Sequence, residues 1–278
     1  MLLHNSIRMR VIFILSILFL ANRISGQELY VFSNPASNNP AKSMAIKVSS
    51  KVLREVHDDA LGSRQTADVA FGLHKNLQLN TALSFSDMYF TNMRWESARI
   101  YAKYRFLSID NVHSHFRAAA FAKAAVSRNP LVYQELDLEG DNSGMQGGLV
   151  FTQLIHKFAA SAGVSYLQQM GQSERRSLGP PFSTQAVQYN ISAGYLLFPR
   201  SYQSYEQTNL NLYCELLGQK NLDLQRSFVD IAPALQLIVK STTRINAGAR
   251  FQVAGDAHRM ARNSFFISLE HYLLQALK

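Results

Sequence analysis

The segment Ser97-Ala-Arg-Ile-Tyr-Ala-Lys-Tyr-Arg-Phe106 alternates between two kinds of side chain along its whole length. Apolar residues occupy the even positions from Ala98 to Phe106, and polar or cationic residues occupy most of the odd positions from Ser97 to Arg105. Because successive side chains of a strand point to opposite faces, this period of two predicts a β-strand with one apolar face. Its length suits a tilted strand crossing a bilayer, which needs about 9–11 residues.

The same alternation recurs from about residue 43 to the end of the chain. Val187–Leu197 and Arg244–Val253 repeat it clearly. Weaker examples are Met44–Val52, Ala67–Leu73, Leu77–Phe85, Phe116–Val126, Gly147–Ile155, Phe158–Tyr166, Leu210–Leu216, Phe228–Val239 and Phe265–Leu273. The predicted fold is all-β, a single antiparallel transmembrane β-barrel of about 12 strands (roughly 10–14), since bacterial barrels have an even number.

Segments rich in Gly, Pro, Ser, Asn and charged residues separate these strands. The longer loops are expected at Asn34–Pro40, Asp137–Ser143, Ser173–Ser183 and Ser201–Gln207. Phe116–Val126 leaves an alternative open, because its six alanines favour a helix of about three turns. The strand is preferred there because the flanking segments alternate.

The first 26 residues have the layout of a secretory signal peptide. Arg8 and Arg10 precede the apolar stretch Val11–Ala21, and a short polar step ends before Gln27. The apolar stretch is shorter than the roughly 20 residues of a spanning helix. The sequence thus predicts a signal peptide at residues 1–26, an N-terminal extension at 27–42 and the barrel at 43–278.

Composition argues against several classes of function. Lys and Arg number 28 against 19 Asp and Glu, and the excess is spread along the chain instead of forming the basic cluster of a nucleic-acid binder. Cys214 is the only cysteine, so an intrachain disulfide and a cysteine-built metal site are excluded. We expect neither a nucleic-acid partner nor a cofactor.

The histidines and carboxylates offer a few candidate catalytic or metal sites. His113-Ser-His115 resembles a metal pair without a third ligand nearby, and His57-Asp-Asp59 and Asp256-Ala-His258 look like exposed loop groups. Gly140–Gly144 lacks the acidic pattern of a calcium loop and is interpreted as a turn. With no nucleophile elbow or phosphate-binding loop in the sequence, the prediction is a protein that is not an enzyme and holds no metal.

The alternation also predicts which charged side chains face the lumen. Together with Glu96, the expected lumen-lining residues are Arg99, Lys103, Arg105, Arg117, Lys123, Glu215, Asp230, Arg244, Arg250 and Glu270. Confined charges in such numbers should form pairs. A narrow barrel would pack them as a polar plug, whereas a wider one would present a partly cationic lining that favours small anionic solutes.

Several segments of the sequence resemble those of a known protein family. Glu28–Ser37, Ser86–Tyr89, Arg94–Phe106 and Thr208–Leu216 resemble segments of uncharacterised outer-membrane β-barrel proteins of Bacteroidota-type bacteria. The resemblance covers nearly the whole chain after the signal peptide and implies an envelope location, with no substrate or site. One departure is the ending Gln275-Ala-Leu-Lys278, where many such barrels finish on an aromatic residue.

Three functions therefore compete. The preferred one is an outer-membrane barrel acting as a passive channel, a transport accessory or a structural envelope protein, whose partners are membrane lipid, lipopolysaccharide and the barrel-insertion machinery. The alternative is a soluble periplasmic or secreted β-sandwich or lipocalin-like binding protein, and the third is a membrane-embedded hydrolase. The first two share the alternation but differ in whether the apolar face points outward or inward.

Overall fold

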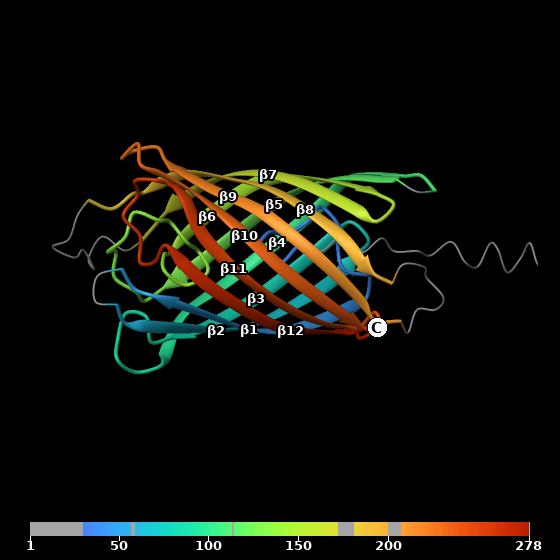
Figure 1. The fold of residues 1–278 in the computed structure, drawn as a ribbon, viewed down its shortest axis with the longest axis horizontal. Helices are drawn as coiled ribbons and strands as arrows, with labels where there is room; N and C mark the ends of the chain where they lie inside the picture. The colour runs from blue at the N-terminus through green and yellow to red at the C-terminus, as the bar shows by residue number, and fades with distance from the viewer. Residues whose placement is uncertain (1–29, 57–58, 113, 172–180, 200–206, 278) are drawn as a thin grey trace, which may run out of the picture.

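The computed structural model describes residues 30–56, 59–112, 114–171, 181–199 and 207–277. These residues form a closed antiparallel barrel of twelve strands (Figure 1), which confirms the predicted fold class and strand number. The strands are β1 (Ser43–Arg54), β2 (Leu61–His74), β3 (Leu77–Ser86), β4 (Arg94–Asp110), β5 (Ser114–Ser127), β6 (Gly144–Ile155), β7 (Phe158–Gln169), β8 (Gln185–Phe198), β9 (Asn209–Asn221), β10 (Ser227–Val239), β11 (Thr243–Gly255) and β12 (Asn263–Leu273).

Each strand pairs with its neighbours in the sequence, and β1 closes the barrel by pairing with β12. Closure leaves no strand edge with unpaired backbone groups, which is the condition for a β-structure in lipid. The described residues contain no helix long and apolar enough to cross a membrane.

The alanine-rich segment forms strand β5, as preferred, and not a helix. Its backbone pairs with β4 on one side and β6 on the other, so tertiary pairing outweighs the helical propensity of alanine. The small side chains have a second consequence. Ala119 packs against Ala36 of the segment that runs inside the barrel, and both are fully buried.

The apolar faces point outward. Ile100, Ile191 and Phe265 are 47%, 61% and 60% exposed, whereas the inward Ser97 and Gln236 are buried. An apolar exterior around a polar interior is the arrangement of a barrel whose solvent is lipid. It is the reverse of a lipocalin-like protein, so the soluble alternative is not favoured.

The two ends of the barrel differ in their connections (Figure 1). At one end, here called the turn end, β2 and β3 are joined only by residues 75–76, and β6 and β7 only by residues 156–157. At the opposite, loop end, β5 and β6 are joined by residues 128–143 and β11 and β12 by residues 256–262. Apart from residues 199–208 between β8 and β9, the connections at the turn end are shorter than those at the loop end. This asymmetry is typical of outer-membrane barrels.

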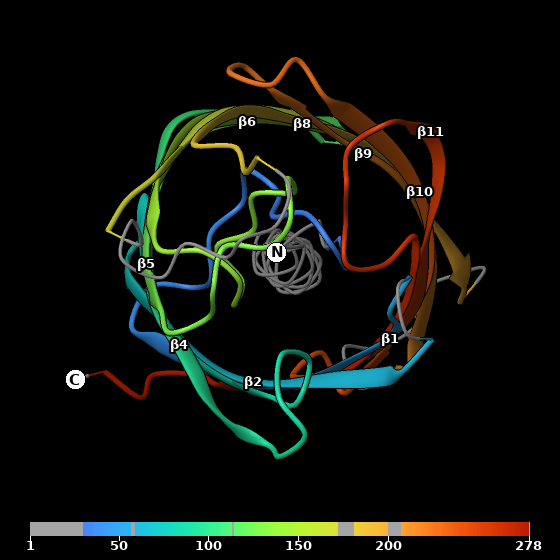
Figure 2. The ribbon, with the colours of Figure 1, turned by 90° about the vertical axis from the view of Figure 1, so that its left-hand side faces the viewer.

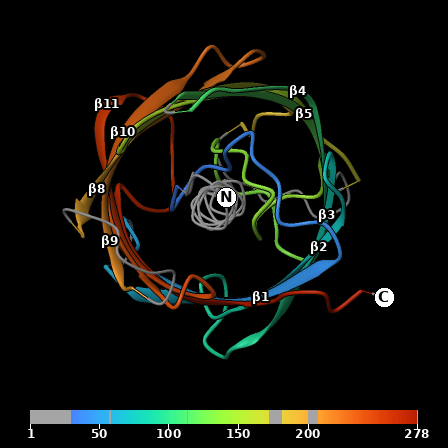
Figure 3. The same cartoon turned by 90° about the vertical axis from the view of Figure 1, so that its right-hand side faces the viewer.

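Two irregular segments run inside the barrel (Figures 2 and 3). One is Tyr30–Lys42, here called the strap, and the other is Arg128–Ser143, here called the acidic loop. The predicted loops at Asn34–Pro40 and Asp137–Ser143 belong to these segments and lie in the lumen. The predicted loops at Ser173–Ser183 and Ser201–Gln207 and the signal peptide fall mostly or wholly outside the described residues.

Candidate functional site in the barrel lumen

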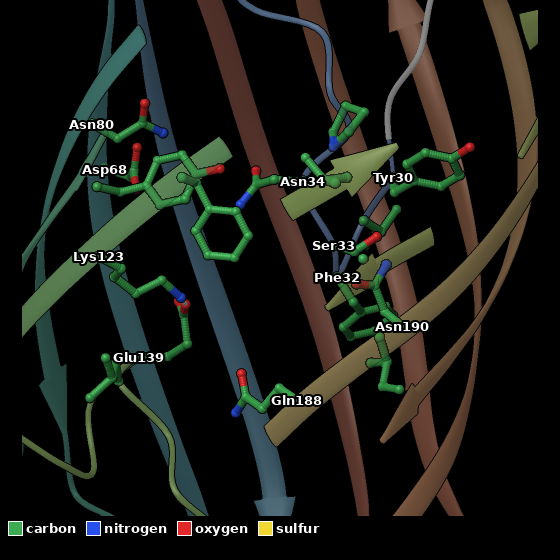
Figure 4. Close-up of a pocket in the computed structure, with 18 of the residues that line it drawn as sticks. Tyr30, Phe32, Ser33, Asn34, Asp68, Asn80, Lys123, Glu139, Gln188 and Asn190 are labelled. Atoms are coloured by element: carbon green, nitrogen blue, oxygen red, sulfur yellow. Dashed lines mark hydrogen bonds and ion pairs between the residues drawn. The ribbon is translucent and has the colours of Figure 1, made fainter. Parts of the chain in front are cut away.

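A cavity of about 400 Å³ lies inside the barrel, between the strap and the acidic loop (Figure 4). Amide side chains such as Asn80, Gln188 and Asn190 line it from opposite walls. Eight basic residues also line it, namely Lys47, Lys51, Arg64, Arg99, Lys103, Lys123, Arg244 and Arg250. Five acidic residues accompany them, namely Asp68, Glu135, Asp137, Glu139 and Glu270.

The residues predicted to line the lumen divide into two groups. Those that line the cavity are Arg99, Lys103, Lys123, Arg244, Arg250 and Glu270. The others, Arg105, Arg117, Glu215 and Asp230, bind the backbone or side chains of other elements around it. Glu96 is buried beside Arg64. A role for any of them in passing a solute stays a prediction.

The first half of the strap is bound by one carboxylate of strand β9. Glu215, which is fully buried, accepts hydrogen bonds from the backbone N–H groups of Val31, Phe32 and Ser33 at 3.0, 2.8 and 2.9 Å. Ser192 of β8 donates a fourth hydrogen bond at 3.0 Å. Four donors replace the water that this carboxylate would otherwise keep, so its burial is compensated without a neighbouring cation.

The second half of the strap is also bound through its backbone. Lys103 donates to the carbonyls of Pro35 and Ser37 at 2.8 and 2.5 Å. The Ala36 N–H donates to the Thr152 hydroxyl at 2.9 Å. Beyond them, Gln78 accepts from the Asn39 N–H, also at 2.9 Å. The strap therefore crosses the lumen held mainly by wall side chains that contact its main chain.

The acidic loop has a carboxylate at every second residue, in the run Glu135-Leu-Asp-Leu-Glu-Gly-Asp141. Arg64 of β2 is central to its attachment, because its guanidinium pairs with Asp137 at 3.7 Å and with Asp141. The same guanidinium pairs with Glu96 of the wall, which also accepts from the Asn129 amide at 2.9 Å. This buried guanidinium thus joins the loop to strands β2 and β4.

Glu135 enters a second ionic cluster at the loop end. Arg259 pairs with Glu135 and with Asp230 of β10, at 2.8 Å in both cases. Arg250 of β11 pairs with the same two carboxylates, at 3.2 Å to Glu135. Although burial opposes ionisation, the charges of Arg259 and Arg250 hold the pKa of Glu135 well below its usual value.

Glu139 forms the third cluster on the opposite wall. Lys123 of β5 pairs with it at 2.8 Å (Figure 4), and Arg99 of β4 pairs with it as well. Arg99 also reaches Asp68 of β2 at 3.3 Å. The three clusters connect the loop to several strands around the barrel.

The residues between the acids attach the loop in a different way. Leu136 and Leu138 are buried in an apolar cluster with Leu167 and two wall alanines. The backbone N–H of Leu136 donates to the Gln219 side chain at 2.9 Å, and the same side chain donates back to the Leu136 carbonyl at 2.8 Å. The loop is therefore bound through its charges, its aliphatic side chains and its main chain at once.

A row of alternating charge runs across four adjacent strands. In register, Arg244 of β11 faces Glu270 of β12, which faces Lys47 of β1, which faces Asp68 of β2. Arg244 and Glu270 form an ion pair at 3.5 Å. Within the described part of the chain, Lys47 takes part in no ion pair and lies over the ring of Phe266 at 5.5 Å.

Sequence reasoning missed several of these residues. Lys47 and Lys51 lie on the inward phase of β1 and could have been found by the same alternation. The carboxylates at every second residue from Glu135 to Asp141 are also visible in the sequence, where Asp137–Ser143 is predicted only as a longer loop. These carboxylates enter the lumen because they contact residues of distant strands, such as Arg64 of β2. A local sequence pattern does not predict such contacts.

The other candidate residues lie away from the cavity lining. His115 contacts Asp110 at 2.8 Å, while His113, His57 and Asp58 fall outside the described residues. Asp59 and Asp256 are exposed, as predicted. His258 was wrongly expected to be exposed, since its ring stacks on Tyr133 at 5.4 Å. In the described residues no group of His, Cys, Asp and Glu is arranged to hold a metal ion.

Comparison with known proteins identifies solved structures with this architecture. An outer membrane channel from Pseudomonas putida F1 matches with a TM-score of 0.60 and 10% identity, over 88% of this chain and all of that one. The KdgM and NanC porins match with TM-scores of 0.49, at 7% and 10% identity, over 82% and 83% of this chain and 98% and 100% of theirs. No family model and no curated protein matches the sequence. The match to the Pseudomonas putida structure shows that the chain has the fold of an outer-membrane β-barrel.

Proposed function

We propose that this protein is an outer-membrane channel for small hydrophilic solutes, with a lumen narrowed by the strap and the acidic loop. The observation that carries the proposal is the polar cavity of about 400 Å³ inside a closed barrel with an apolar exterior. A barrel of this strand number is wide enough to leave space that its own side chains do not fill. The likeness to a Pseudomonas putida outer membrane channel supports the same function.

The orientation follows from the two ends of the barrel. Short turns are typical of the periplasmic side and longer loops of the extracellular side. The turn end would then face the periplasm, and the acidic loop would enter the lumen from outside. The apolar belt would contact lipid and the lipid part of lipopolysaccharide, after assembly by the barrel-insertion machinery.

The cavity lining gives an expectation for ion selectivity. Its eight basic and five acidic residues leave a moderate positive excess. Fixed charges on a pore wall favour counter-ions. We therefore expect a weak preference for anions, much smaller than a lining of unpaired arginines would give, because most of these cations already have carboxylate partners.

Reconstitution into planar lipid bilayers tests the proposal. We expect discrete conductance steps in potassium chloride, with a reversal potential under a salt gradient that indicates a modest preference for chloride. A purely structural envelope protein would insert, as judged by heat-modifiable migration on a gel, and yet give no steps at any voltage. That second outcome would replace the channel by a closed scaffold.

A further inference from the structure

We propose that the lumen wall facing the acidic loop is a binding site for an acidic peptide, and that the loop occupies this site as an internal substitute for the ligand. The inference rests on the proposed channel function and names the class of solute that the channel would admit. Three independent sets of contacts support it: charge, aliphatic packing and main-chain hydrogen bonds.

The charges of wall and loop balance one another. Seven cations face this part of the lumen, namely Lys47, Lys51, Arg64, Arg99, Lys123, Arg250 and Arg259. Three wall carboxylates, Asp68, Glu96 and Asp230, compensate some of them. The loop supplies the remaining four negative charges, so without the loop the wall would hold four uncompensated cations. Such a surface attracts a polyanion.

The acids of the loop reach cations on different sides of the lumen. Residues 138–141 form a turn, in which the Asn142 N–H donates to the Asp137 carbonyl at 2.9 Å. Within this folded segment Glu135, Asp137, Glu139 and Asp141 each meet at least one guanidinium or ammonium group of the wall. A peptide with the same order of carboxylates could replace them by folding in the same way.

The remaining contacts select a peptide among such polyanions. The Gln219 amide both accepts from and donates to the main chain of Leu136, and Asn221 donates to the Gln134 carbonyl at 2.8 Å. Leu136 and Leu138 enter an apolar pocket of the wall. A site that recognises carboxylates, alternate aliphatic side chains and peptide groups matches an acidic peptide in all three respects.

Gly140 shows how closely loop and wall fit. A Cβ atom at this position would overlap the carboxylate of Glu96 and the guanidinium of Arg64. Both groups are buried and held by several ion pairs, so they cannot turn away freely. We therefore expect Gly140→Val to lift the loop from the wall without removing any wall charge.

The test uses the full-length protein in detergent and the synthetic peptide Gln-Glu-Leu-Asp-Leu-Glu-Gly-Asp, which copies residues 134–141. Binding is measured by isothermal titration calorimetry. We expect the double variant Glu135→Gln/Glu139→Gln, in which the loop loses its pairs with Arg250, Arg259, Arg99 and Lys123, to bind the peptide at least about tenfold tighter than the wild type. Gly140→Val should behave in the same way. Asp59→Asn, which changes an exposed acid of the β1–β2 connection, is the matched control and should bind like the wild type.

Two further ligands make the assignment falsifiable. The amide peptide Gln-Gln-Leu-Asn-Leu-Gln-Gly-Asn should bind the double variant at least about tenfold weaker than the acidic one. Equal binding of the two peptides, or no binding to either loop variant when both migrate as folded barrels, would overturn the proposal. Tighter binding of an oligoglucuronate with the same number of carboxylates would overturn the assignment to a peptide. Because calorimetry requires no conductance, failure here is distinguishable from failure of the channel in bilayers.

Discussion

The strap and the acidic loop both fill the lumen, but the wall holds them by different means. The strap is bound mainly through its backbone: Glu215 accepts from three of its N–H groups, and Lys103 donates to two of its carbonyls. The acidic loop is bound mainly through its own side chains, in ion pairs with Arg64 and other wall cations. One barrel can therefore bind one segment largely by main-chain contacts and another by its charge pattern.

Because the two segments are held differently, different substitutions should release the strap and the acidic loop. Hydrogen bonds to backbone groups depend little on which side chains the strap carries. Ion pairs depend on the acids of the loop and the cations of the wall together, so a change in either partner should release the loop. Selective variants can therefore free one segment and leave the other in place.

The largest effect is expected from Arg64→Met, which breaks the attachment of the loop. The substitution leaves Glu96, Asp137 and Asp141 without their shared guanidinium. Removing one partner of a buried ion pair typically costs about 3–5 kcal/mol. Urea unfolding in micelles, followed by the fluorescence of the single tryptophan, should show this loss.

Hydrogen exchange locates the effect of that variant. Amides of the acidic loop should exchange faster, whereas those of the strap should keep their protection. The control Arg54→Met removes an exposed ion pair with Asp59 and should cost less than about 1 kcal/mol. Equal loss of protection in strap and loop would show that the two segments are not held separately.

A smaller loss of stability is expected from Glu215→Gln, which weakens the hydrogen bonds that hold the strap. The amide keeps the size of the side chain but offers its backbone donors one acceptor oxygen in place of two. A buried N–H left without an acceptor costs about 1–3 kcal/mol. We expect the free energy of unfolding to fall by about 2–3 kcal/mol in the same assay. Amide exchange should be faster in residues 31–33 and unchanged in the acidic loop.

Ser192→Ala is the matched control for that variant, since it removes one of the four donors and leaves the carboxylate in place. It should cost about 1 kcal/mol and keep the strap protected. Release of the acidic loop by either variant would contradict separate attachment.

The smallest effect is expected from moderate acidification. The pKa of Glu135 lies below its usual value of 4.5, because Arg259 and Arg250 outweigh the effect of burial. A carboxylate with a lowered pKa contributes its full stabilisation above the usual value and loses it only as the pH falls through the lowered one. Its pairs should therefore be intact between pH 8 and about pH 5.

Asp137 responds in the opposite sense. Burial, together with the like charges of Asp141 and Glu139, raises its pKa despite the attraction of Lys51 and Arg64. Its protonation on acidification therefore favours the docked loop slightly. Hydrogen exchange at pH 7 and pH 5, corrected for the intrinsic rate, should give equal or slightly higher protection of the loop. A marked loss at pH 5 would show that Glu135 is not held ionised by its arginines.

The orientation of many wall side chains could be predicted, because alternating residues of a strand point to opposite faces. The period of two placed Arg99 and Lys103 toward the axis and Ile100 toward the exterior, as the structure shows. The same rule applied to β1 would have added Lys47 and Lys51. Even the alanine-rich β5 followed the pattern of its neighbours and not the preference of its residues for helix.

The path of the irregular segments was not predictable in the same way. The residues of Asp137–Ser143 do not by themselves predict that the segment folds inward. Its partners Arg64 and Arg99 lie on β2 and β4, far away in the sequence, and only Lys123 lies on the neighbouring β5. The path of the strap is even harder to predict from the sequence. The strap is held through main-chain groups, and every residue type has these groups. Glu215 could be predicted to face the lumen, but not to bind three backbone N–H groups there.

The strands, their approximate number and the side chains that meet lipid or lumen can be inferred from the sequence alone, because those properties follow from alternation along the chain. The partial filling of the lumen, and the residues that fill it, become visible only in the folded barrel. Filling depends on the width of the closed cylinder and on matching charges between segments over a hundred residues apart, such as Glu135 and Arg250. Such matches exist only once the barrel has closed and brought its distant strands around one axis.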